Sequence, residues 1–242
     1  MIMISIMELR IFLGEFLGLL VFVVVHGGIL ATTILTGKPN VGSTALAVFL
    51  GVSFGLFTAI AGGSGAHINP AVTIALLVYR SVGVDLSNAL VYIAGQILGG
   101  FVGGFILWVI YRPQFKRLNT PFSPLSGNPD PKDLIQNVIT SILGSFFAAL
   151  LFIIAGRATL PNTSIFPLVA AAAVLAVNLA FGGTSYSLLN VARDLGPRFT
   201  ATVLGLGKPT WIQVFLLTIA SLVGGALAGL VVTFLSYFIN LG

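Results

Sequence analysis

The chain has 242 residues, of which 57% are hydrophobic and only 7% are charged, and its net charge is +5. Soluble domains carry about 25% charged residues, so this composition excludes a soluble globular enzyme and predicts an integral membrane protein. The absence of cysteine excludes disulfides, thiolate catalysis and cysteine-bound metals, and the eleven basic residues form no stripe of the kind that binds nucleic acid.

Six apolar stretches are long enough to cross a bilayer, which needs about 20 residues. They cover residues 10–35, 43–61, 86–111, 134–155, 165–181 and 211–239. The first is expected to be a retained span rather than a cleavable signal, because its apolar run continues to about residue 35. We therefore expect an all-α membrane protein that forms one domain over residues 1–242.

Two shorter apolar pieces, residues 69–79 and 190–202, lie between the spans. Asn69-Pro70-Ala71 predicts a helix start, because Asn is a preferred N-cap and Pro is favoured in the first helical turn. So short a helix cannot cross a bilayer, and its free N–H groups are tolerated at membrane depth only where it packs in protein or lines a watery cavity. This pattern is typical of the half-helix of a channel or a transporter.

The polar loop 112–133 divides the chain into two halves, about 8–111 and 134–240, with three spans each. Three spans per half make the two halves run through the membrane in opposite senses. Asn190-Val191-Ala192 in the second half matches Asn69-Pro70-Ala71 in the first. These features predict an inverted repeat whose two broken helices meet near the midplane of the membrane.

Two motifs carry a resemblance to a known family. Gly65-Ala66-His67-Ile68-Asn69-Pro70-Ala71-Val72-Thr73 and Asn190-Val191-Ala192-Arg193-Asp194-Leu195-Gly196-Pro197-Arg198 resemble the signature loops of the aquaporin, or major intrinsic protein, family. Asp194 after Arg193 is similar to the glycerol facilitator (aquaglyceroporin) branch. The resemblance covers nearly the whole chain. It implies six transmembrane helices plus two re-entrant half-helices, a pore in every subunit and a homotetramer. No cofactor is expected, and two histidines with six acids leave little for a metal site.

The second half departs from the family pattern at two positions. Val191 stands where the family has proline, and Ser141 stands where a glutamate would correspond to Glu15 of the first half. The effect of Val191 is expected to be small, because the N–H that it restores is one of the unpaired groups at any helix start. Since both departures fall in the second half, its loop is expected to be held more loosely than the first.

The resemblance places Asn69 and Asn190 at the pore centre, where each would cap its half-helix and offer an amide N–H to a passing oxygen. The facing positive ends of the two helix dipoles would repel protons and cations. The selectivity constriction is expected to consist of Phe49, Asn178, Ser187 and Arg193. The branch usually has two aromatic residues and a small one, so this constriction would be more polar.

Further residues are expected to line the pore or to support its loops, namely His67, Gly65, Ala66, Glu15 and Asp194. His67 could either offer its carbonyl to a solute or be a buried, hydrogen-bonded histidine. Glu15 should accept hydrogen bonds from the backbone N–H groups of a re-entrant loop. Asp194 should hold the second loop and pair with Arg198, four residues further along the helix.

The sequence therefore predicts a passive channel for small uncharged solutes, which include glycerol, similar polyols and water. The polar constriction extends this prediction to dihydroxyacetone, urea or protonated lactic acid. No catalysis is expected. Ion coupling is not expected either, because coupled carriers use intramembrane acids and only Glu15 and Asp194 are available. An inverted-repeat secondary transporter and a non-conducting structural relative stay open as alternatives.

The expected location is a bacterial plasma membrane, with lipids and small neutral solutes as partners and the N-terminus in the cytoplasm. The distribution of charge disagrees with that orientation, because cytoplasmic loops usually carry the excess of Lys and Arg. Three basic residues would lie inside and six outside, the first set being Arg10, Arg80 and Arg157 and the second Lys38, Arg112, Lys116, Arg117, Lys132 and Lys208.

Overall fold

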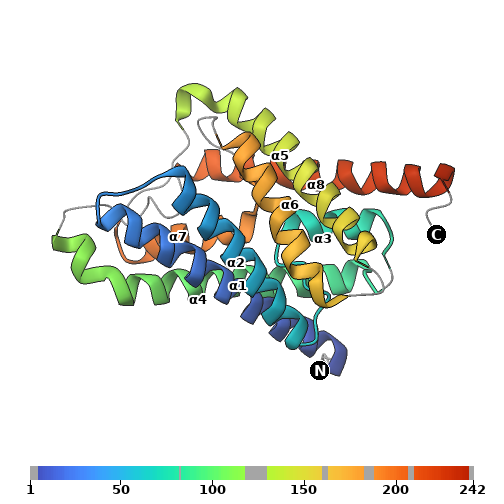
Figure 1. Ribbon diagram of the computed structural model, residues 1–242, viewed down its shortest axis with the longest axis horizontal. Coiled ribbons are helices and arrows are strands. Elements are labelled where there is room, and N and C mark those ends of the chain that lie inside the picture. The colour runs from blue at the N-terminus through green and yellow to red at the C-terminus, as the bar shows by residue number, and fades with distance from the viewer. Residues whose placement is uncertain are drawn as a thin grey trace.

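The chain folds entirely into helices and connecting segments over the residues that the structure describes (Figure 1). The structure is a computed structural model, and it describes residues 5–81, 83–117, 130–159, 163–182, 188–206 and 210–239. The α-helices are α1 (Ile6–Leu35), α2 (Val41–Ala61), α3 (Pro70–Val78), α4 (Leu86–Arg117), α5 (Leu134–Ala158), α6 (Phe166–Phe181), α7 (Val191–Val203) and α8 (Trp211–Ile239). Two short 3-10 turns, η2 (Pro131–Asp133) and η3 (Thr163–Ile165), precede α5 and α6.

The first two helices begin at polar residues that separate the apolar runs. At the start of α1, Ser5 Oγ accepts a hydrogen bond from the Glu8 N–H at 3.1 Å, and the Glu8 carboxylate accepts one from the Ser5 N–H at 2.7 Å. Asn40 and Ser43 form the same reciprocal pair at the start of α2. Such capping boxes satisfy N–H groups that the helix itself leaves unpaired, and they explain why these helices begin where they do.

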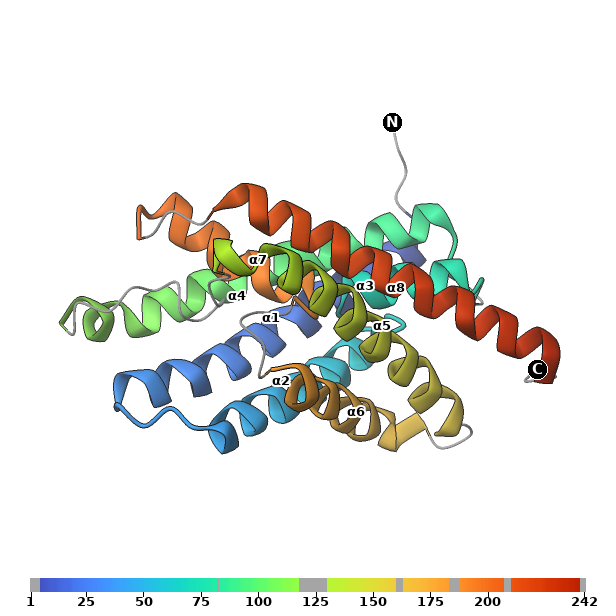
Figure 2. The ribbon, with the colours of Figure 1, turned by 90° about the horizontal axis from the view of Figure 1, so that it is seen from above.

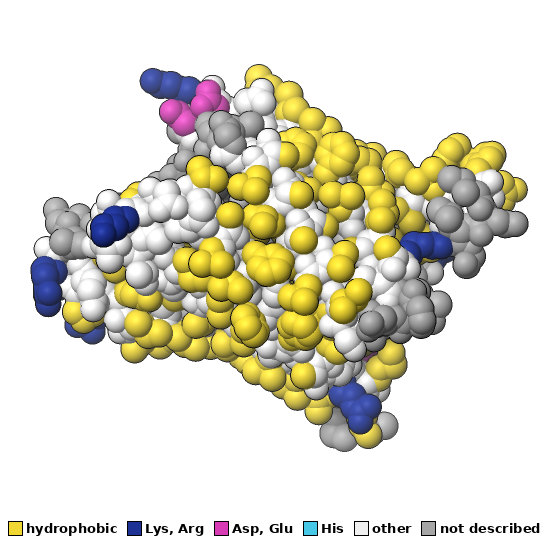
Figure 3. Space-filling model, viewed as in Figure 1, with side chains coloured by type: hydrophobic (Ala, Val, Ile, Leu, Met, Phe, Trp, Pro, Cys, Tyr) yellow, Lys and Arg dark blue, Asp and Glu magenta, His cyan; other side chains and the backbone are white. Residues whose placement is uncertain are grey.

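Five helices of the described chain are long and apolar enough to cross a membrane, namely α1, α2, α4, α5 and α8. The span predicted at 165–181 is present as α6, but this helix has only 16 residues and is about 24 Å long at 1.5 Å per residue. Figure 3 shows hydrophobic side chains spread over one face of the molecule, with Lys and Arg toward its ends. This distribution suits a protein whose sides face lipid.

The short helix of each half packs mainly against the other half of the chain. Within the first half α1 packs against α2 and α4, and within the second half α5 packs against α6 and α8. The short helix α3 of the first half packs mainly against α8 of the second, whereas α7 packs mainly against α4 of the first. Figure 2 shows α3 beside α8 and α7 beside α4. Each half-helix is therefore positioned mostly by the other half of the chain.

Glycines allow this packing by bringing helix backbones close together. A Cβ added at Gly196 of α7 would overlap the backbone of Gly100 in α4. A Cβ added at Gly225 of α8 would overlap the carbonyl of Ala71 in α3. Close approach through small residues is how helices associate where no hydrophobic driving force acts between them. These contacts fix where the N-terminus of each half-helix points.

Candidate functional site

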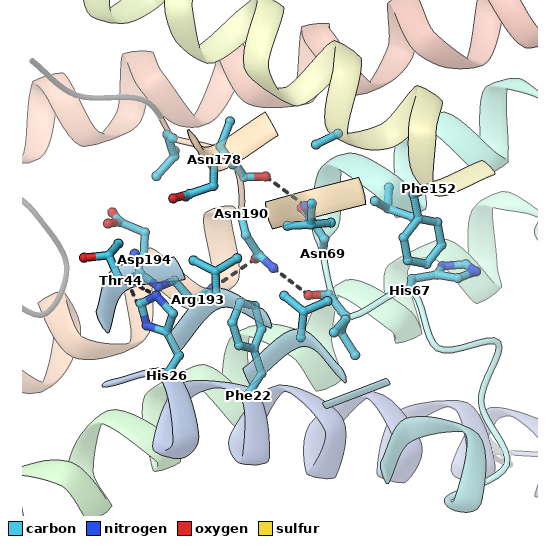
Figure 4. Close-up of a pocket in the computed structure, with 18 of the residues that line it drawn as sticks. Phe22, His26, Thr44, His67, Asn69, Phe152, Asn178, Asn190, Arg193 and Asp194 are labelled. Atoms are coloured by element: carbon cyan, nitrogen blue, oxygen red, sulfur yellow. Dashed lines mark hydrogen bonds between the residues drawn. The ribbon is translucent and has the colours of Figure 1, made fainter. Parts of the chain in front are cut away.

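The two asparagines lie near each other in the pocket, and the side chain of each bonds to the loop that carries the other (Figure 4). Asn69 Oδ1 accepts a hydrogen bond from the Ala71 N–H at 2.9 Å, while Asn69 Nδ2 donates to the Leu189 carbonyl at 2.8 Å. Asn190 Nδ2 donates to the Ile68 carbonyl at 2.7 Å. A carboxamide carries two N–H groups, so each asparagine can cap, cross-link and still offer one N–H to a solute.

The second cap is built slightly differently from the first. Asn190 Oδ1 accepts from the Arg193 N–H at 3.1 Å, which is the third helical residue of α7, whereas Asn69 bonds to the second residue of α3. Val191 takes the first helical position in α7, where Pro70 stands in α3. The valine therefore leaves the cap intact, as expected for a residue whose N–H needs no partner within the helix.

Glu15 anchors the loop before α3. It is completely buried, and its two oxygens accept four hydrogen bonds. The donors are the backbone N–H groups of His67 at 2.9 Å and Ile68 at 2.7 Å, the Ser64 hydroxyl at 2.8 Å and the Gln96 amide at 2.7 Å. A buried carboxylate with this many donors is satisfied, and the predicted role of Glu15 as acceptor for the loop agrees with these contacts.

The same loop has an unusual backbone. Ala66 and Ile68 have φ angles of 53° and 40°, in the left-handed region that residues with a Cβ seldom adopt. Such conformations cost about 1–3 kcal/mol each and persist only where neighbouring contacts enforce them. The contact at Gly65, whose N–H donates to the Tyr92 hydroxyl at 3.1 Å, adds to those of Glu15. The loop is therefore a strained segment held by buried polar groups.

His67 is the buried, hydrogen-bonded histidine of the two alternatives that the sequence left open. Its imidazole is buried, stacks on Tyr92 with ring centres 3.8 Å apart, and has Nδ1 3.2 Å from the Thr73 hydroxyl. His67 nevertheless lines the central cavity. Gly65, Ala66 and Glu15 do not line it, so their contribution is to hold the loop.

We call the loop before α3, together with α3, the first arm, and the loop before α7, together with α7, the second arm. In the second arm, hydroxyl groups take the place of the carboxylate. Ser141 Oγ accepts from the Leu188 N–H at 2.9 Å, and Ser145 Oγ donates to the Leu188 carbonyl at 3.0 Å. Ser145 also contacts Ser221 of α8 at 2.8 Å. The sequence pointed to Ser141 only. Ser145 was missed because a serine in an apolar helix has no distinctive pattern of its own.

A buried ion pair completes the second arm. Arg198 Nε donates to Asp194 Oδ2 at 2.6 Å, and both side chains are 2% exposed. This is the pairing that their spacing of four residues predicted. The two charges offset each other within α7, so this pair buries no net charge.

A cavity of about 150 Å³ lies at the N-terminal ends of the two half-helices. It is lined by Phe22, His26, Leu30, Thr44, Val48, Val52, His67, Ile68, Asn69, Val72, Ala148, Phe152, Val174, Asn178, Leu188, Leu189, Asn190, Arg193 and Asp194. Six of the residues predicted for the site are among them, namely Asn69, Asn190, Asn178, Arg193, His67 and Asp194. Ser187 lies outside the described residues.

Phe49 differs from the prediction. It is partly buried and packs against the hydrophobic core instead of lining the cavity, where Val48 takes its place. Consecutive residues of a helix point about 100° apart, so an error of one residue in counting back along α2 moves the predicted side chain to another face. The cavity wall contributed by α2 is therefore aliphatic instead of aromatic at this level.

His26 is a cavity residue that the sequence reasoning missed. Arg193 Nη2 lies 3.0 Å from His26 Nδ1 and 3.1 Å from His26 Nε2. Figure 4 shows His26, Thr44, Arg193 and Asp194 together at one end of the cavity, with His67 and Phe152 at the other. A signal was available, because Glu15, Phe22 and His26 are spaced for one face of a helix.

The arrangement suits the passage of a small neutral molecule. Two helix N-termini and one guanidinium face a narrow cavity, and each of them presents hydrogen-bond donors and positive potential. Aliphatic and aromatic side chains, such as Val48, Val72 and Phe152, line much of the remaining wall. A neutral solute with oxygen acceptors can pass these donors, whereas a cation is repelled by them.

Comparison with known proteins gives a consistent result. The family described as "Major intrinsic protein" matches residues 3–232. The chain is 30% identical over 227 residues to the glycerol uptake facilitator protein of Bacillus subtilis (strain 168), which covers 90% of this chain and 82% of the relative. It is also 30% identical to glycerol uptake facilitator protein 2 of Lactiplantibacillus plantarum, over 93% of this chain and 99% of the relative.

A solved structure extends the comparison to three dimensions. The aquaglyceroporin from Plasmodium falciparum superposes with a TM-score of 0.82 at 25% sequence identity. The match covers 96% of this chain and 97% of that chain. The similarity therefore includes both halves and both short helices.

Proposed function

Because this chain belongs to the major intrinsic protein family, we propose that it is a passive channel for glycerol, similar small polyols and water. The observation that carries the proposal is the pair of asparagine-capped half-helices, whose N-termini face one cavity and whose side chains bond across to each other's loop. No catalytic step is involved. Solute would move down its own concentration gradient.

At the pore centre, Asn69 and Asn190 would each donate one amide N–H to an oxygen of the passing solute. Both amides are oriented by their second hydrogen bond, to the Leu189 and Ile68 carbonyls, so they need not reorganise as the solute arrives. The positive ends of α3 and α7 would exclude protons and other cations at the same point.

The constriction would be formed by Arg193 together with Asn178, Val48 and Ser187. Arg193 would donate hydrogen bonds to hydroxyl or carbonyl oxygens. A half-buried charge at membrane depth is costly, and function usually explains such a cost. The side chain of Val48 is smaller than the aromatic side chain expected at this position, so it leaves more space in the cavity. For this reason the proposed range of solutes includes dihydroxyacetone, urea and protonated lactic acid.

The chain is an integral membrane protein, and we propose that it resides in a bacterial plasma membrane as a homotetramer with its N-terminus in the cytoplasm. The exposed apolar faces of the long helices suit contact with lipid and with other subunits. A C-terminal reporter that is active only in the cytoplasm would test the orientation. Light scattering of the purified protein would test the tetramer.

Stopped-flow light scattering on proteoliposomes tests the channel. Glycerol, urea, dihydroxyacetone and water should each equilibrate faster than in protein-free vesicles, without saturation and without dependence on sodium or on a proton gradient. Saturable, ion-dependent flux would indicate a secondary transporter instead. Equal rates with and without protein for all solutes would reject the channel.

A bulky side chain placed in the cavity tests the route of the solute, and the same side chain placed outside the cavity is the matched control. Ala148 lines the cavity and is nearly fully buried, so Ala148→Trp should block the flux of every solute. Leu227 is 42% exposed on α8, away from the cavity, and Leu227→Trp should conduct like the wild type. Flux that persists in Ala148→Trp would show that solute takes another route.

A further inference from the structure

The contact between His26 and Arg193 joins two distant parts of the chain at one end of the cavity. His26 is on α1, is 5% exposed, and lies 3.0 and 3.1 Å from Arg193 Nη2 through its two ring nitrogens. Its ring packs edge-on against Phe22, with ring centres 5.7 Å apart. Both His26 and Arg193 line the cavity, so the contact forms part of the wall that a solute meets.

The neighbouring helix leaves room for this imidazole. A Cβ added at Gly51 of α2 would lie 2.9 Å from the Cβ of His26 and 2.8 Å from the ring of Phe22. Any larger residue at position 51 would push α1 and its two rings away from α2. Gly51 therefore helps to fix the position of His26 at the cavity wall.

The chemistry of the two groups is complementary. A guanidinium carries only donors, whereas a neutral imidazole has one nitrogen that accepts and one that donates. Arg193 Nη2 lies within 3.1 Å of both ring nitrogens, and only the nitrogen that carries no hydrogen can accept its N–H. A protonated imidazole would instead put two positive charges about 3 Å apart, where their repulsion is large. Neutral His26 therefore holds Arg193 in place and occupies part of its donor capacity.

We propose that His26 is a specificity-determining residue of the channel, which holds the Arg193 guanidinium against one wall and adds a second polar side chain at that level. The inference rests on the proposed channel function. Thr44 of α2 lines the same cavity, and Asn178 lines it from α6 (Figure 4). A solute at this level therefore meets polar groups from several helices.

This lining selects solutes by the distribution of their polar groups. Glycerol has hydroxyls along one edge and C–H groups along the other, so it is best matched by a wall with one polar and one apolar side. Urea carries hydrogen-bonding groups on every edge. A constriction made polar by His26, Arg193 and Asn178 therefore favours urea-like solutes relative to glycerol, and the loss of His26 shifts the balance back toward glycerol.

The test measures the ratio of urea to glycerol permeability in proteoliposomes for three substitutions. His26→Phe keeps an aromatic ring but removes both nitrogens, and the ratio should fall about tenfold or more, the size expected for losing one hydrogen bond to a charged group. His26→Gln keeps an acceptor and a donor at similar reach, and should stay within about twofold of the wild type. Tyr79→Phe is the matched control, because it removes an oxygen 2.5 Å from another arginine, Arg157, outside the cavity.

The outcomes separate this inference from the channel itself. If the wild type conducts and His26→Phe has the wild-type ratio, the role of His26 is rejected while the channel stands. If the wild type conducts neither solute, the proposed function fails and the role of His26 with it. If His26→Phe does not assemble, His26→Asn decides, because its amide is too short to reach the guanidinium. A ratio in His26→Asn that matches the wild type would reject the inference.

Discussion

The two arms of the pore are alike in position but are held by different chemistry. The loop before α3 is held by one buried carboxylate, Glu15, which accepts four hydrogen bonds. The loop before α7 is held at Leu188 by hydrogen bonds with the hydroxyls of Ser141 and Ser145. Hydrogen bonds to a charged group are about twice as strong as bonds between neutral groups. The first arm therefore concentrates its support in one residue.

The backbone of the first arm explains why it needs so strong an anchor. Two residues with a Cβ, Ala66 and Ile68, are in the left-handed region, and Glu15 bonds to the N–H of Ile68 itself. The second arm instead contains a buried ion pair, Asp194 and Arg198, inside α7. The two arms therefore differ in role: the first is a strained loop fixed by Glu15, and the second carries Arg193 into the cavity wall.

The largest effect is expected from Glu15→Ala. The substitution leaves the buried N–H groups of His67 and Ile68 without their acceptor, and the free energy of unfolding should fall by about 4 kcal/mol. Thermal or SDS-induced unfolding in detergent micelles measures the loss, and solute flux should disappear with it. Glu8→Ala, at the exposed start of the same helix, is the control and should lose far less. Equal losses in the two variants would contradict the special role of Glu15.

A slightly smaller effect is expected from Asp194→Asn. It leaves the guanidinium of Arg198 buried with a neutral neighbour, and the expected loss of stability is about 3 kcal/mol. Adding Arg198→Gln to the same chain should recover part of this loss, because no unbalanced charge is then buried. The same unfolding assay applies. A double variant that is less stable than the single one would show that Arg198 is stabilised chiefly by other contacts.

Ser141→Ala should cost about 1 kcal/mol, the contribution of one neutral hydrogen bond to the Leu188 N–H. Ser145 still bonds to the Leu188 carbonyl, so the loop should keep its position and flux should continue. The comparison between Ser141→Ala and Glu15→Ala measures the difference between the arms directly. Equal losses of stability in the two variants would mean that the two arms are held equally strongly.

The smallest effect is expected from Val191→Pro, which gives the second half-helix the first residue that α3 already has. A proline compatible with the first helical turn reduces the freedom of the unfolded chain, so stability should rise by about 0.5 kcal/mol. The reciprocal change in the first arm, Pro70→Val, should lower it by a similar amount. A marked loss of stability in Val191→Pro would mean that the N–H of Val191 has a structural partner.

Much of the fold could be predicted from the sequence. Long apolar runs located the spanning helices, and the predicted all-α fold with two half-helices is confirmed by the superposition on an aquaglyceroporin structure. The main difference is in α6, which is shorter than a typical span. Asn69 and Asn190 could be predicted because helix caps follow from a few adjacent residues.

The candidate site was predicted less completely than the fold. Of the residues predicted for the constriction, Arg193 and Asn178 line the cavity, whereas Phe49 packs against the hydrophobic core and Val48 lines the cavity in its place. His26 was missed because it precedes both signature motifs and its partner is 167 positions away in the sequence.

The sequence by itself determined which segments are helical, where the half-helices begin and which residues cap them, because these properties depend on composition and on neighbours a few positions apart. Only the tertiary structure decided which side of α2 faces the cavity and that His26 on α1 meets Arg193 on α7. The rotation of each helix about its axis is set by packing, here by glycines such as Gly51, Gly100 and Gly225 that allow backbones to approach. A rotation of one residue exchanges an aromatic wall for an aliphatic one.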